Sequence, residues 1–284
     1  MKLLYTVEEI EKWRDKAHRR TPRLAVRTRM KALAFINDVG FCFAFKSVSS
    51  ELPCLWHAAC GEREPVMPRR THHDPFISFV WEMKNVLPAE RLVYYGKVLK
   101  HRPTLISLEM FPYFYALTRR TGSKDDYLRA FRRGELSPVA KAIMDALMDS
   151  SPQVTRGLKI AVGGNSARAR AGFDRAMAEL QMKMYVVKVA EHYDPFTFEW
   201  ELVPKAFAAQ VRKARQITVQ DARTRILDQY FRNQLVGSVP SISRLFGWDR
   251  QLIFQTLGML VNRGIITPDV TVDGKRSAAY CLID

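Results

Sequence analysis

Three side chains on one short predicted helix are of the types that bind zinc. Cys54, His57 and Cys60 recur at every third position, and Cys42 lies nearby. Thiolate and imidazole are the usual ligands of structural zinc sites. However, three ligands along two turns of one helix do not converge tetrahedrally without distant partners, and small thiols on an apolar face usually contribute to packing. The sequence therefore favours packing, and it predicts no metal and no other cofactor.

A second polar group could bind a metal or relay protons. It consists of the adjacent residues His72 and His73, followed by Asp74. Imidazole changes its charge near neutral pH, which suits both roles. Adjacent side chains diverge, however, and this segment precedes a helix predicted from about Pro75 to Val86. A solvated turn is therefore the favoured interpretation.

A third group consists of arginines suited to binding an anion. Arg168 and Arg170 lie in the first turn of a helix predicted over residues 167–182, and Arg175 lies on the same helix. Positive side chains in the first turn oppose the helix dipole, so a bound anion would compensate them. The N-terminal turn of a recognition helix is also where base edges and phosphates are met. We predict that these arginines bind DNA, the alternative being exposed side chains without a partner.

The elements around these arginines are those of a winged helix. Ser137-Pro138 begins a helix that ends near Met148, a second short helix covers residues 156–161, and Gly163-Gly164 begins the turn before the third. Apolar runs at residues 184–189 and 197–202 predict two strands around a wing at residues 192–195. Three helices followed by a two-stranded ribbon predict a winged helix here.

The same pattern recurs at the C-terminus. Apolar residues at helical spacing predict three helices between residues 222 and 260, with Gly247-Trp248-Asp249 as the turn between the second and third. Asp273-Gly274 is typical of a hairpin turn before a return strand at residues 279–283. A winged helix in this position would bring Arg250 near base edges and Lys275 and Arg276 beside phosphates. Because this module is only weakly basic, contact with another protein stays an open alternative.

The N-terminal region is more basic. Residues 1–31 contain ten Lys and Arg against four Asp and Glu, and the run ends with Arg27, Arg29 and Lys31. Part of this charge belongs to a solvated helix face that starts at the capping pattern Thr6 to Glu9. The density is nevertheless high enough to predict phosphate contacts.

These segments divide the chain into three predicted modules. A charge-rich connector at residues 122–134 separates an N-terminal helical, winged-helix-like module (1–133) from a middle winged helix (134–204). A basic linker helix then leads into a C-terminal winged helix (205–284). The expected fold class is mainly α with small β wings, built from tandem winged-helix (helix-turn-helix) modules.

Composition favours a nucleic-acid partner. The 284 residues carry a formal net charge of +16, and 47% of them are hydrophobic. Such a charge favours a polyanionic partner, and nucleic acid before a membrane surface. No apolar run is long enough to span a bilayer, and the N-terminus does not resemble a signal peptide. We expect a cytoplasmic, nucleoid-associated protein with reduced cysteines. The sequence carries no signal for a particular oligomeric state.

Two motifs add a resemblance to a known family. The stretch from Ala32 to Gly40 and the later Trp81 with Leu87-Pro88, set before two tandem winged helices, resemble the AlkZ/YcaQ-type family. Characterised members of that family are DNA glycosylases that act on alkylated or crosslinked bases. The resemblance implies a catalytic triplet, Gln-x-Gln or Gln-x-Asp in the family, at Asn37-Asp38-Val39. Asn37 keeps a carboxamide, Asp38 supplies a carboxylate, and Val39 replaces the second polar group.

Three hypotheses follow. The first is a protein that binds duplex DNA mainly through phosphate contacts, because no nucleotide-binding loop or nucleophile elbow is present. The second is a DNA glycosylase that uses Asn37 and Asp38, and the third is a winged-helix adaptor that binds protein.

The first hypothesis predicts a strong salt dependence of DNA binding. If the protein contacts six or more phosphates, its affinity should fall by about 10³-fold or more between about 50 and 200 mM salt, because binding releases counterions. A titration of a labelled duplex at several salt concentrations measures this slope. A flat response would favour the adaptor.

The middle module should contribute more to DNA binding than the C-terminal wing. We expect the double substitution of Arg168 and Arg170 by alanine to weaken binding more than that of Lys275 and Arg276, since the first pair starts the third helix of the more basic module. Each lost phosphate or base contact should cost on the order of 1–3 kcal/mol. Equal losses of affinity in the same titration would contradict the prediction that the helix over residues 167–182 is the main DNA-binding helix.

Overall fold

Helices and four small sheets build the protein. The computed structural model describes residues 3–45, 52–163, 167–268, 270–276 and 278–283. Each of the four sheets in this part of the chain has three strands, with the orders β1-β10-β11, β8-β12-β9, β2-β4-β3 and β5-β7-β6. This agrees with the expectation of a mainly α-helical protein with small β elements. None of the described helices is long and apolar enough to cross a membrane.

The N-terminal part surrounds the sheet β2-β4-β3. Its elements are β1 (Leu3–Tyr5), α1 (Val7–Ala17), η1 (Pro22–Leu24), α2 (Arg29–Val39), β2 (Phe41–Phe43), α3 (Leu55–Cys60), η2 (Thr71–His73), α4 (Pro75–Ala89), β3 (Val93–Leu99), β4 (Arg102–Ser107) and α5 (Phe111–Ala116). β4 is the central strand, and Ile106 lies opposite both Phe41 and Tyr94. The helix predicted over residues 75–86 is α4, which ends three residues later, at Ala89.

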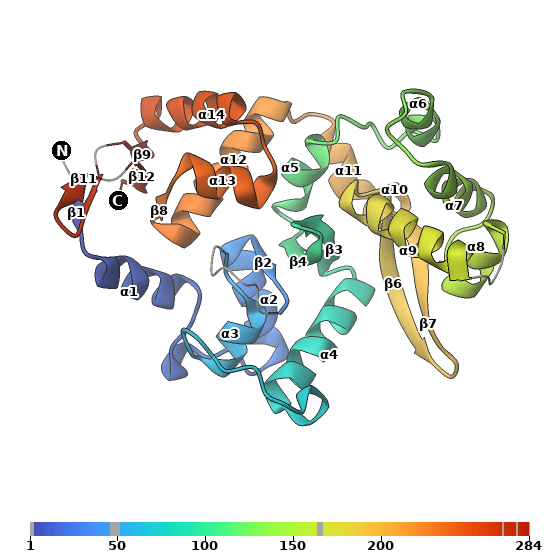
Figure 1. Ribbon diagram of the computed structural model, residues 1–284, viewed down its shortest axis with the longest axis horizontal. Helices are drawn as coiled ribbons and strands as arrows, with labels where there is room; N and C mark the ends of the chain where they lie inside the picture. The colour runs from blue at the N-terminus through green and yellow to red at the C-terminus, as the bar shows by residue number, and fades with distance from the viewer. Residues whose placement is uncertain (1–2, 46–51, 164–166, 269, 277, 284) are drawn as a thin grey trace.

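The middle part consists of the three predicted helices, a two-residue strand, one long hairpin and a further helix. Its elements are α6 (Asp126–Arg132), α7 (Pro138–Asp149), β5 (Gln153–Val154), α8 (Thr155–Ala161), α9 (Ala167–Met182), β6 (Val186–Tyr193) and β7 (Phe196–Leu202). The further helix, α6, lies within residues 122–134, which the sequence predicts as a connector, and its Tyr127 and Ala130 are buried in the core of the middle part. The Ser137 side chain accepts a hydrogen bond from the Ala140 amide and so caps α7 as the sequence predicts. The β6–β7 hairpin is longer than predicted and extends away from α8 and α9 past α4 (Figure 1).

The C-terminal part starts with two short helices and continues with three amphipathic ones. Its elements are α10 (Val203–Ala206), α11 (Ala208–Ala214), α12 (Val219–Gln234), β8 (Val236–Gly237), α13 (Val239–Phe246), α14 (Arg250–Asn262), β9 (Ile266–Thr267), β10 (Val270–Val272), β11 (Lys275–Arg276) and β12 (Tyr280–Leu282). Gly247, with φ of 69°, ends α13, and Asp249 caps α14. The linker predicted as one helix is thus divided between α10 and α11.

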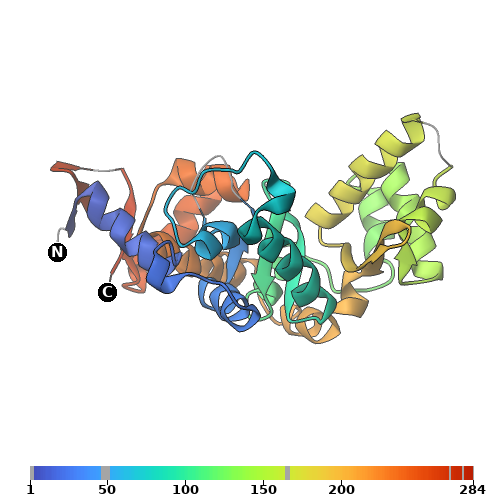
Figure 2. The same cartoon turned by 90° about the horizontal axis from the view of Figure 1, so that it is seen from below.

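One apolar core joins residues from all three parts. It contains Phe41 and Phe111 from the N-terminal part, Met184 from the middle and Leu227 and Leu257 from the C-terminal part. Further cores lie beside α2, α3 and α4 and within α6–β7. Figure 2 shows the middle part at one end of the elongated molecule and both termini at the other.

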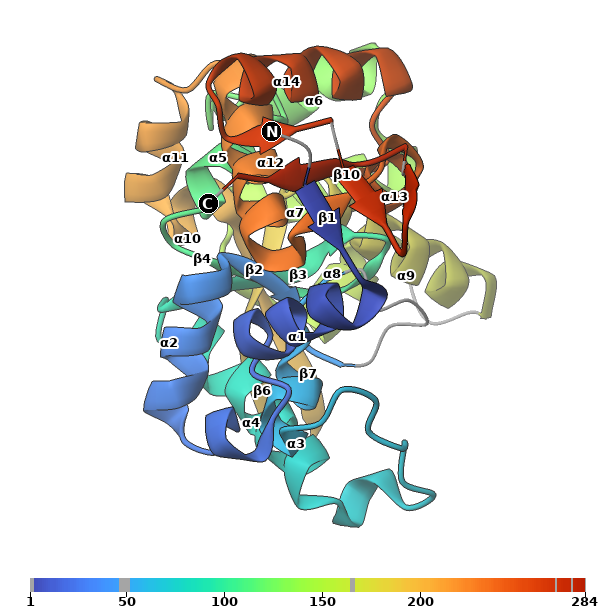
Figure 3. The same cartoon turned by 90° about the vertical axis from the view of Figure 1, so that its left-hand side faces the viewer.

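The two ends of the chain form a sheet that the sequence did not predict. β1 pairs in parallel with β10, which pairs with β11 in the hairpin around Asp273 (Figure 3). The Val7 amide donates to a carboxylate oxygen of Asp273 at 3.1 Å, and the Asp273 amide donates to the Tyr5 carbonyl at 2.9 Å. The outer edge of this hairpin is therefore covered by the N-terminal strand.

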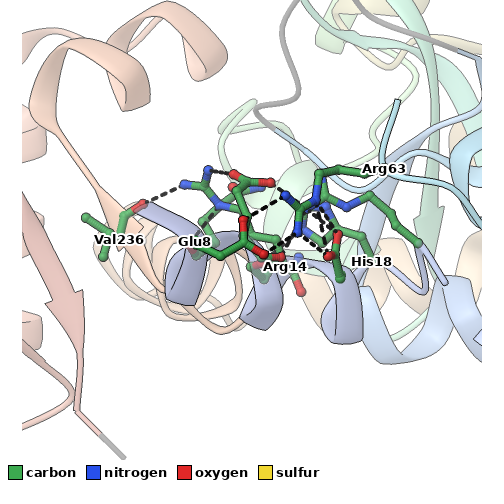
Figure 4. A network of polar contacts seen from close by, with 10 residues as sticks. Glu8, Arg14, His18, Arg63 and Val236 are labelled. Carbon is green, nitrogen blue, oxygen red and sulfur yellow. Dashed lines mark hydrogen bonds and ion pairs between the residues drawn. The ribbon is translucent and has the colours of Figure 1, made fainter. Parts of the chain in front are cut away.

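A polar network fastens α1 to the end of α12 (Figure 4). Arg14 donates through Nε to the Gln234 carbonyl at 3.2 Å, and His18 Nε2 lies 2.9 Å from the Asn233 carbonyl oxygen. The buried guanidinium of Arg20 bridges Glu11 at 2.8 Å and Asp15 at 3.0 Å. Since these contacts satisfy carbonyls at the C-terminal end of a helix, they stabilise both segments together.

The burial of His18 predicts a loss of stability in acid. Burial, and then the charge of Arg20, hold the pKa of His18 well below its ordinary value of 6.5. Below pH 6.5 the unfolded chain therefore binds a proton that the folded protein does not, and stability falls as the pH falls.

We expect the free energy of unfolding of the wild type to decrease by up to about 1.4 kcal/mol per pH unit more than that of His18→Gln between pH 6.5 and 5. Urea titrations at several pH values measure this difference. His101→Gln, at an exposed histidine, is the control and should behave like the wild type. Parallel curves for His18→Gln and the wild type would contradict the assignment.

Candidate functional site

An aromatic cavity of about 600 Å³ lies between α4 and the tip of the β6–β7 hairpin. Its lining residues are Phe45, Met67, Thr71, Ile77, Ser78, Trp81, Glu82, Asn85, Val86 and Tyr193. The Trp81 ring is tilted against the Phe45 ring at a centroid distance of 6.0 Å. Trp81 and Tyr193 are both exposed, so their rings are open to a ligand. A volume of this size suits a small planar molecule bound by stacking.

Local sequence explains the position of α4. The Asp74 side chain accepts a hydrogen bond from the Ile77 amide at 2.8 Å, and Pro75 occupies the first helical turn. Val80, Met83 and Leu87 then form a buried apolar face. Because Lys84 follows Val80 by four residues, it lies on the same face and is buried with it.

A buried group of charges, here termed the lysine–glutamate cluster, lies beside the cavity. It consists of Lys84, Asn85, Lys188 and Glu191. Lys84 Nζ donates to Asn85 Oδ1 at 2.6 Å and to Glu191 Oε1 at 3.2 Å. Lys188 Nζ donates to Asn85 Oδ1 at 2.8 Å and also forms an ion pair with Glu191. The cluster therefore joins α4 to β6.

A β-bulge brings Lys188 and Glu191 to the same side of β6. In a regular strand, residues three apart point to opposite faces. The pairing of β6 with β7 shifts between Lys188 and Ala190, so that Lys188 lies opposite Trp200 and Ala190 opposite Glu199. The extra residue reverses the alternation, and both side chains reach α4.

Asn85 and Tyr193 connect the cluster to the cavity. Asn85 Nδ2 donates to Glu191 Oε2 at 2.8 Å, and the Tyr193 hydroxyl donates to the same oxygen at 3.2 Å. Lys84 Nζ lies 4.0 Å from the centroid of the Trp81 ring, within the range of a cation–π interaction. The cluster thus fixes two of the aromatic residues that form the cavity.

The cluster holds two cations and one anion. Burial, together with the charge of Lys188, lowers the pKa of Lys84 to about 8, and burial lowers the pKa of Lys188. Burial alone would raise the pKa of Glu191, but the hydrogen bond and charge of Lys188 outweigh it, so this pKa is lowered. Glu191 is therefore ionised at neutral pH, and its two oxygens are occupied by partners. Its role here is to position other groups.

Asn37 and Asp38 lie at the C-terminal end of α2, outside this cavity. Both are exposed, and the Asp38 carboxylate forms an ion pair with Arg19. The carbonyl oxygen of Asp38 accepts a hydrogen bond from Gln229 Nε2 at 3.1 Å, which fixes the backbone to α12. The structure does not bring the pair together with the aromatic residues, and their catalytic role stays a prediction.

The predicted DNA-binding residues lie in separate parts of the molecule, at or just before α2, on α9, on α14 and on β11 (Figure 1). The described ones are all exposed: Arg27, Arg29 and Lys31 at the start of α2, Arg170 and Arg175 on α9, and Arg250 on α14. Arg29 pairs with Glu90, and Arg27 lies 5.2 Å from the Phe76 ring centroid. The backbones of Arg168, Lys275 and Arg276 lie in α9 and β11, and their side chains lie outside the described part.

The residues weighed as metal ligands occupy different surroundings. Cys54, His57 and Cys60 are buried at α3, and burial raises the pKa of Cys60 to about 12. Within the described residues, no group of three or more His, Cys, Asp and Glu could hold a metal ion. The His72 side chain lies outside the described part, and Asp74 serves as the cap of α4.

Comparison with known proteins identifies the family. A family model described as AlkZ related matches residues 26–236. The chain belongs to the AlkZ-related family. The matched range includes the cavity and the whole lysine–glutamate cluster. The resemblance drawn from residues 32–40 is thereby confirmed at the level of the family.

The fold has a solved counterpart. The chain is similar to the Streptomyces sahachiroi DNA glycosylase AlkZ, with a TM-score of 0.65 and 16% identity, over 99% of this chain and 70% of that chain. At this identity the similarity shows a shared fold. Among curated proteins, none matches the sequence.

Sequence reasoning missed the lysine–glutamate cluster, although part of its signal was present. Lys84 interrupts the apolar face of a predicted helix, and Lys188 interrupts a predicted apolar strand. A charged residue at a buried position requires a partner. The partner, Glu191, lies beyond the bulge, which the sequence pattern did not indicate.

The unequal charges of the cluster predict unequal effects of substitution. Glu191→Gln leaves two buried ammonium groups without an anion and should lower the free energy of unfolding by about 3–5 kcal/mol. Lys84→Met leaves one balanced pair, Lys188 with Glu191, and should cost less than about 1.5 kcal/mol. Urea unfolding followed by circular dichroism measures both. Similar losses for the two variants would contradict the charge balance described here.

Proposed function

We propose that this protein binds double-stranded DNA and acts in DNA repair. Membership of the AlkZ-related family and the shared fold with a DNA glycosylase support this role. The formal net charge of +16 supports a phosphate backbone as partner, because Lys and Arg neutralise phosphates and release counterions. In this proposal the protein is associated with the nucleoid, and phosphate contacts supply most of the affinity.

We propose further that two parts of the chain are winged helices in tandem. In the middle module (134–204), α7, α8 and α9 would form the helical core, with β6 and β7 as the wing. In the C-terminal module (205–284), α12, α13 and α14 would form the core, with β10 and β11 as the wing. The first module (1–133) would supply most of the cavity lining, and the middle module would add Tyr193. Arg170 and Arg175 on α9, and Arg250 on α14, would then face DNA.

The aromatic cavity is the main structural support for the proposed role in DNA binding and repair. Proteins that act on a base in a duplex take it out of the stack and hold it between aromatic side chains. The cavity has Phe45, Trp81 and Tyr193 as stacking surfaces and a volume of about 600 Å³. Phe196, at the tip of the hairpin, is exposed and is not part of the cavity lining. Apolar side chains in such a position can fill the gap that an extruded base leaves in the duplex.

Release of the extruded base is a second candidate function, and a carboxylate in the cavity supports it. Glu82 is the one carboxylate among the described residues that line the cavity. A carboxylate within hydrogen-bond reach of a water can act as its general base. If the protein releases a base, Glu82 would activate the water that attacks the extruded nucleotide. Asn37 and Asp38 would then not serve as the general base. Binding without base release remains the simpler function.

A binding titration tests the main proposal. Trp81→Ala should weaken binding to duplexes with a mismatched or alkylated base by about 5- to 100-fold, because stacking of a base on an aromatic side chain is worth about 1–3 kcal/mol. Binding to intact duplex should change little, since phosphate contacts dominate it. Leu4→Ala, at an exposed apolar residue on β1 that the proposal places in no DNA contact, is the control and should bind like the wild type. Equal affinities of Trp81→Ala and the wild type for all duplexes would contradict the proposal that the aromatic cavity holds an extruded base.

Two substitutions distinguish the candidate catalytic residues. If the protein releases a base, Glu82→Gln should reduce the rate of release at least about 100-fold while DNA affinity stays nearly unchanged, as expected for a general base. Asp38→Asn should then retain the rate. Abasic sites are measured after incubation with alkylated duplexes. Loss of base release in Asp38→Asn but not in Glu82→Gln would assign the general base to Asp38. If the wild type releases no base, the protein binds DNA without this activity.

A further inference from the structure

A second cavity, of about 560 Å³, lies where the middle part meets α5 and α10. It is formed by the connection between α5 and α6, by α7, and by the residues that flank the β6–β7 hairpin. The Met144, Leu147 and Met148 side chains supply apolar surface on the α7 side. The aromatic cavity and this one share no lining residue. The second cavity is therefore a separate site.

A stacked cation forms one wall of this second cavity. The Arg120 guanidinium carbon lies 3.7 Å from the centroid of the Tyr185 ring and 5.2 Å from that of the Tyr115 ring. Arg120 also donates to the Met184 carbonyl at 3.0 Å, which fixes its plane. Tyr127 lines the same cavity, and its hydroxyl is held by Asp145 at 2.8 Å. Arg120 therefore gives this wall a positive charge beside two aromatic rings.

Two buried hydroxyl groups of lining residues have no partner within the described part of the chain. They are Tyr115 Oη and Ser151 Oγ. A buried hydroxyl without a hydrogen bond is costly, so such groups usually meet a bound molecule or a water. The Tyr115 side chain is completely buried, and burial raises its pKa, so it offers a neutral hydroxyl. A ligand with polar ring atoms would satisfy these groups.

The charges at the edge favour an anionic ligand. Lys124 is exposed and forms no ion pair with a residue that the structure describes, whereas Lys205 is paired with Glu201. Asp126 also lines the cavity, but its two oxygens accept hydrogen bonds from the Gly122 amide and from Arg129. Asp149, the last residue of α7, is the other carboxylate of the lining. Arg120 and Lys124 therefore leave a positive balance on one side.

We propose that this second cavity binds a mononucleotide. The planar base would lie against the Arg120 wall and the methionines of α7, with its polar ring atoms toward the Tyr115 and Ser151 hydroxyls. The phosphate would lie at Lys124. A nucleotide combines the three features that the cavity selects: a flat aromatic ring, polar ring atoms and a negative charge.

Calorimetric titration of the full-length protein with each of the four 5′-deoxymononucleotides tests this proposal. We expect at least one to bind with a Kd below about 1 mM. The matching nucleoside, which lacks the phosphate, should bind about 5- to 10-fold more weakly, and so should the nucleotide to Lys124→Ala. Lys12→Ala, at an exposed lysine on α1, is the matched control and should bind like the wild type.

Three results would overturn the proposal. One is the absence of binding by all four nucleotides. Another is equal binding of the nucleotide and inorganic phosphate, which would show a charge effect alone. The third is loss of nucleotide binding in Trp81→Ala, which would place the ligand in the aromatic cavity. Because that variant separates the two cavities, the test stands apart from the fate of the proposed DNA-binding function.

Discussion

The lysine–glutamate cluster is the interaction on which the aromatic cavity depends. Lys84 and Asn85 come from α4, and Lys188 and Glu191 come from β6, about a hundred residues later. Burying three charges costs free energy, and mutual pairing is what recovers it. The arrangement is therefore narrowly defined: Glu191 must reach both lysines at once. When it does, Trp81 on α4 and Tyr193 on β6 are both held in the lining of the cavity.

A second set of contacts, at the opposite end of the molecule, also holds distant segments of the chain together. There, α1 contributes His18 and Arg14 to the carbonyls at the end of α12, and β1 extends the sheet of the C-terminal hairpin. Gln229 and Asn233 of α12 in turn bond the carbonyls of Asp38 and Val39 at the end of α2. This chain of contacts runs from the terminal sheet to the α2–β2 segment, and Phe45 follows β2.

Local patterns predicted the helices and the hairpins, because capping residues and apolar spacing act within a few residues. Ser137, Asp249 and Gly247 each do what their types indicate. Contacts between distant segments could not be predicted in this way. The bulge beside Lys188 reverses the direction of Glu191, and the parallel pairing of β1 with β10 joins the two ends of the chain. The aromatic residues that share the cavity come from three separate segments, so local patterns could not group them. The catalytic role of Asn37 and Asp38 came from the family resemblance and stays a prediction.

Photo-crosslinking tests the central claim, that the aromatic cavity holds a base extruded from duplex DNA. A duplex with a single 5-iodouracil in a mismatch is irradiated with the protein, and the modified peptide is identified by mass spectrometry. A base held by stacking should react with the aromatic residues that touch it. We expect the adduct to form on Trp81, Phe45 or Tyr193. An adduct confined to residues outside this cavity, such as those of α14, would contradict it.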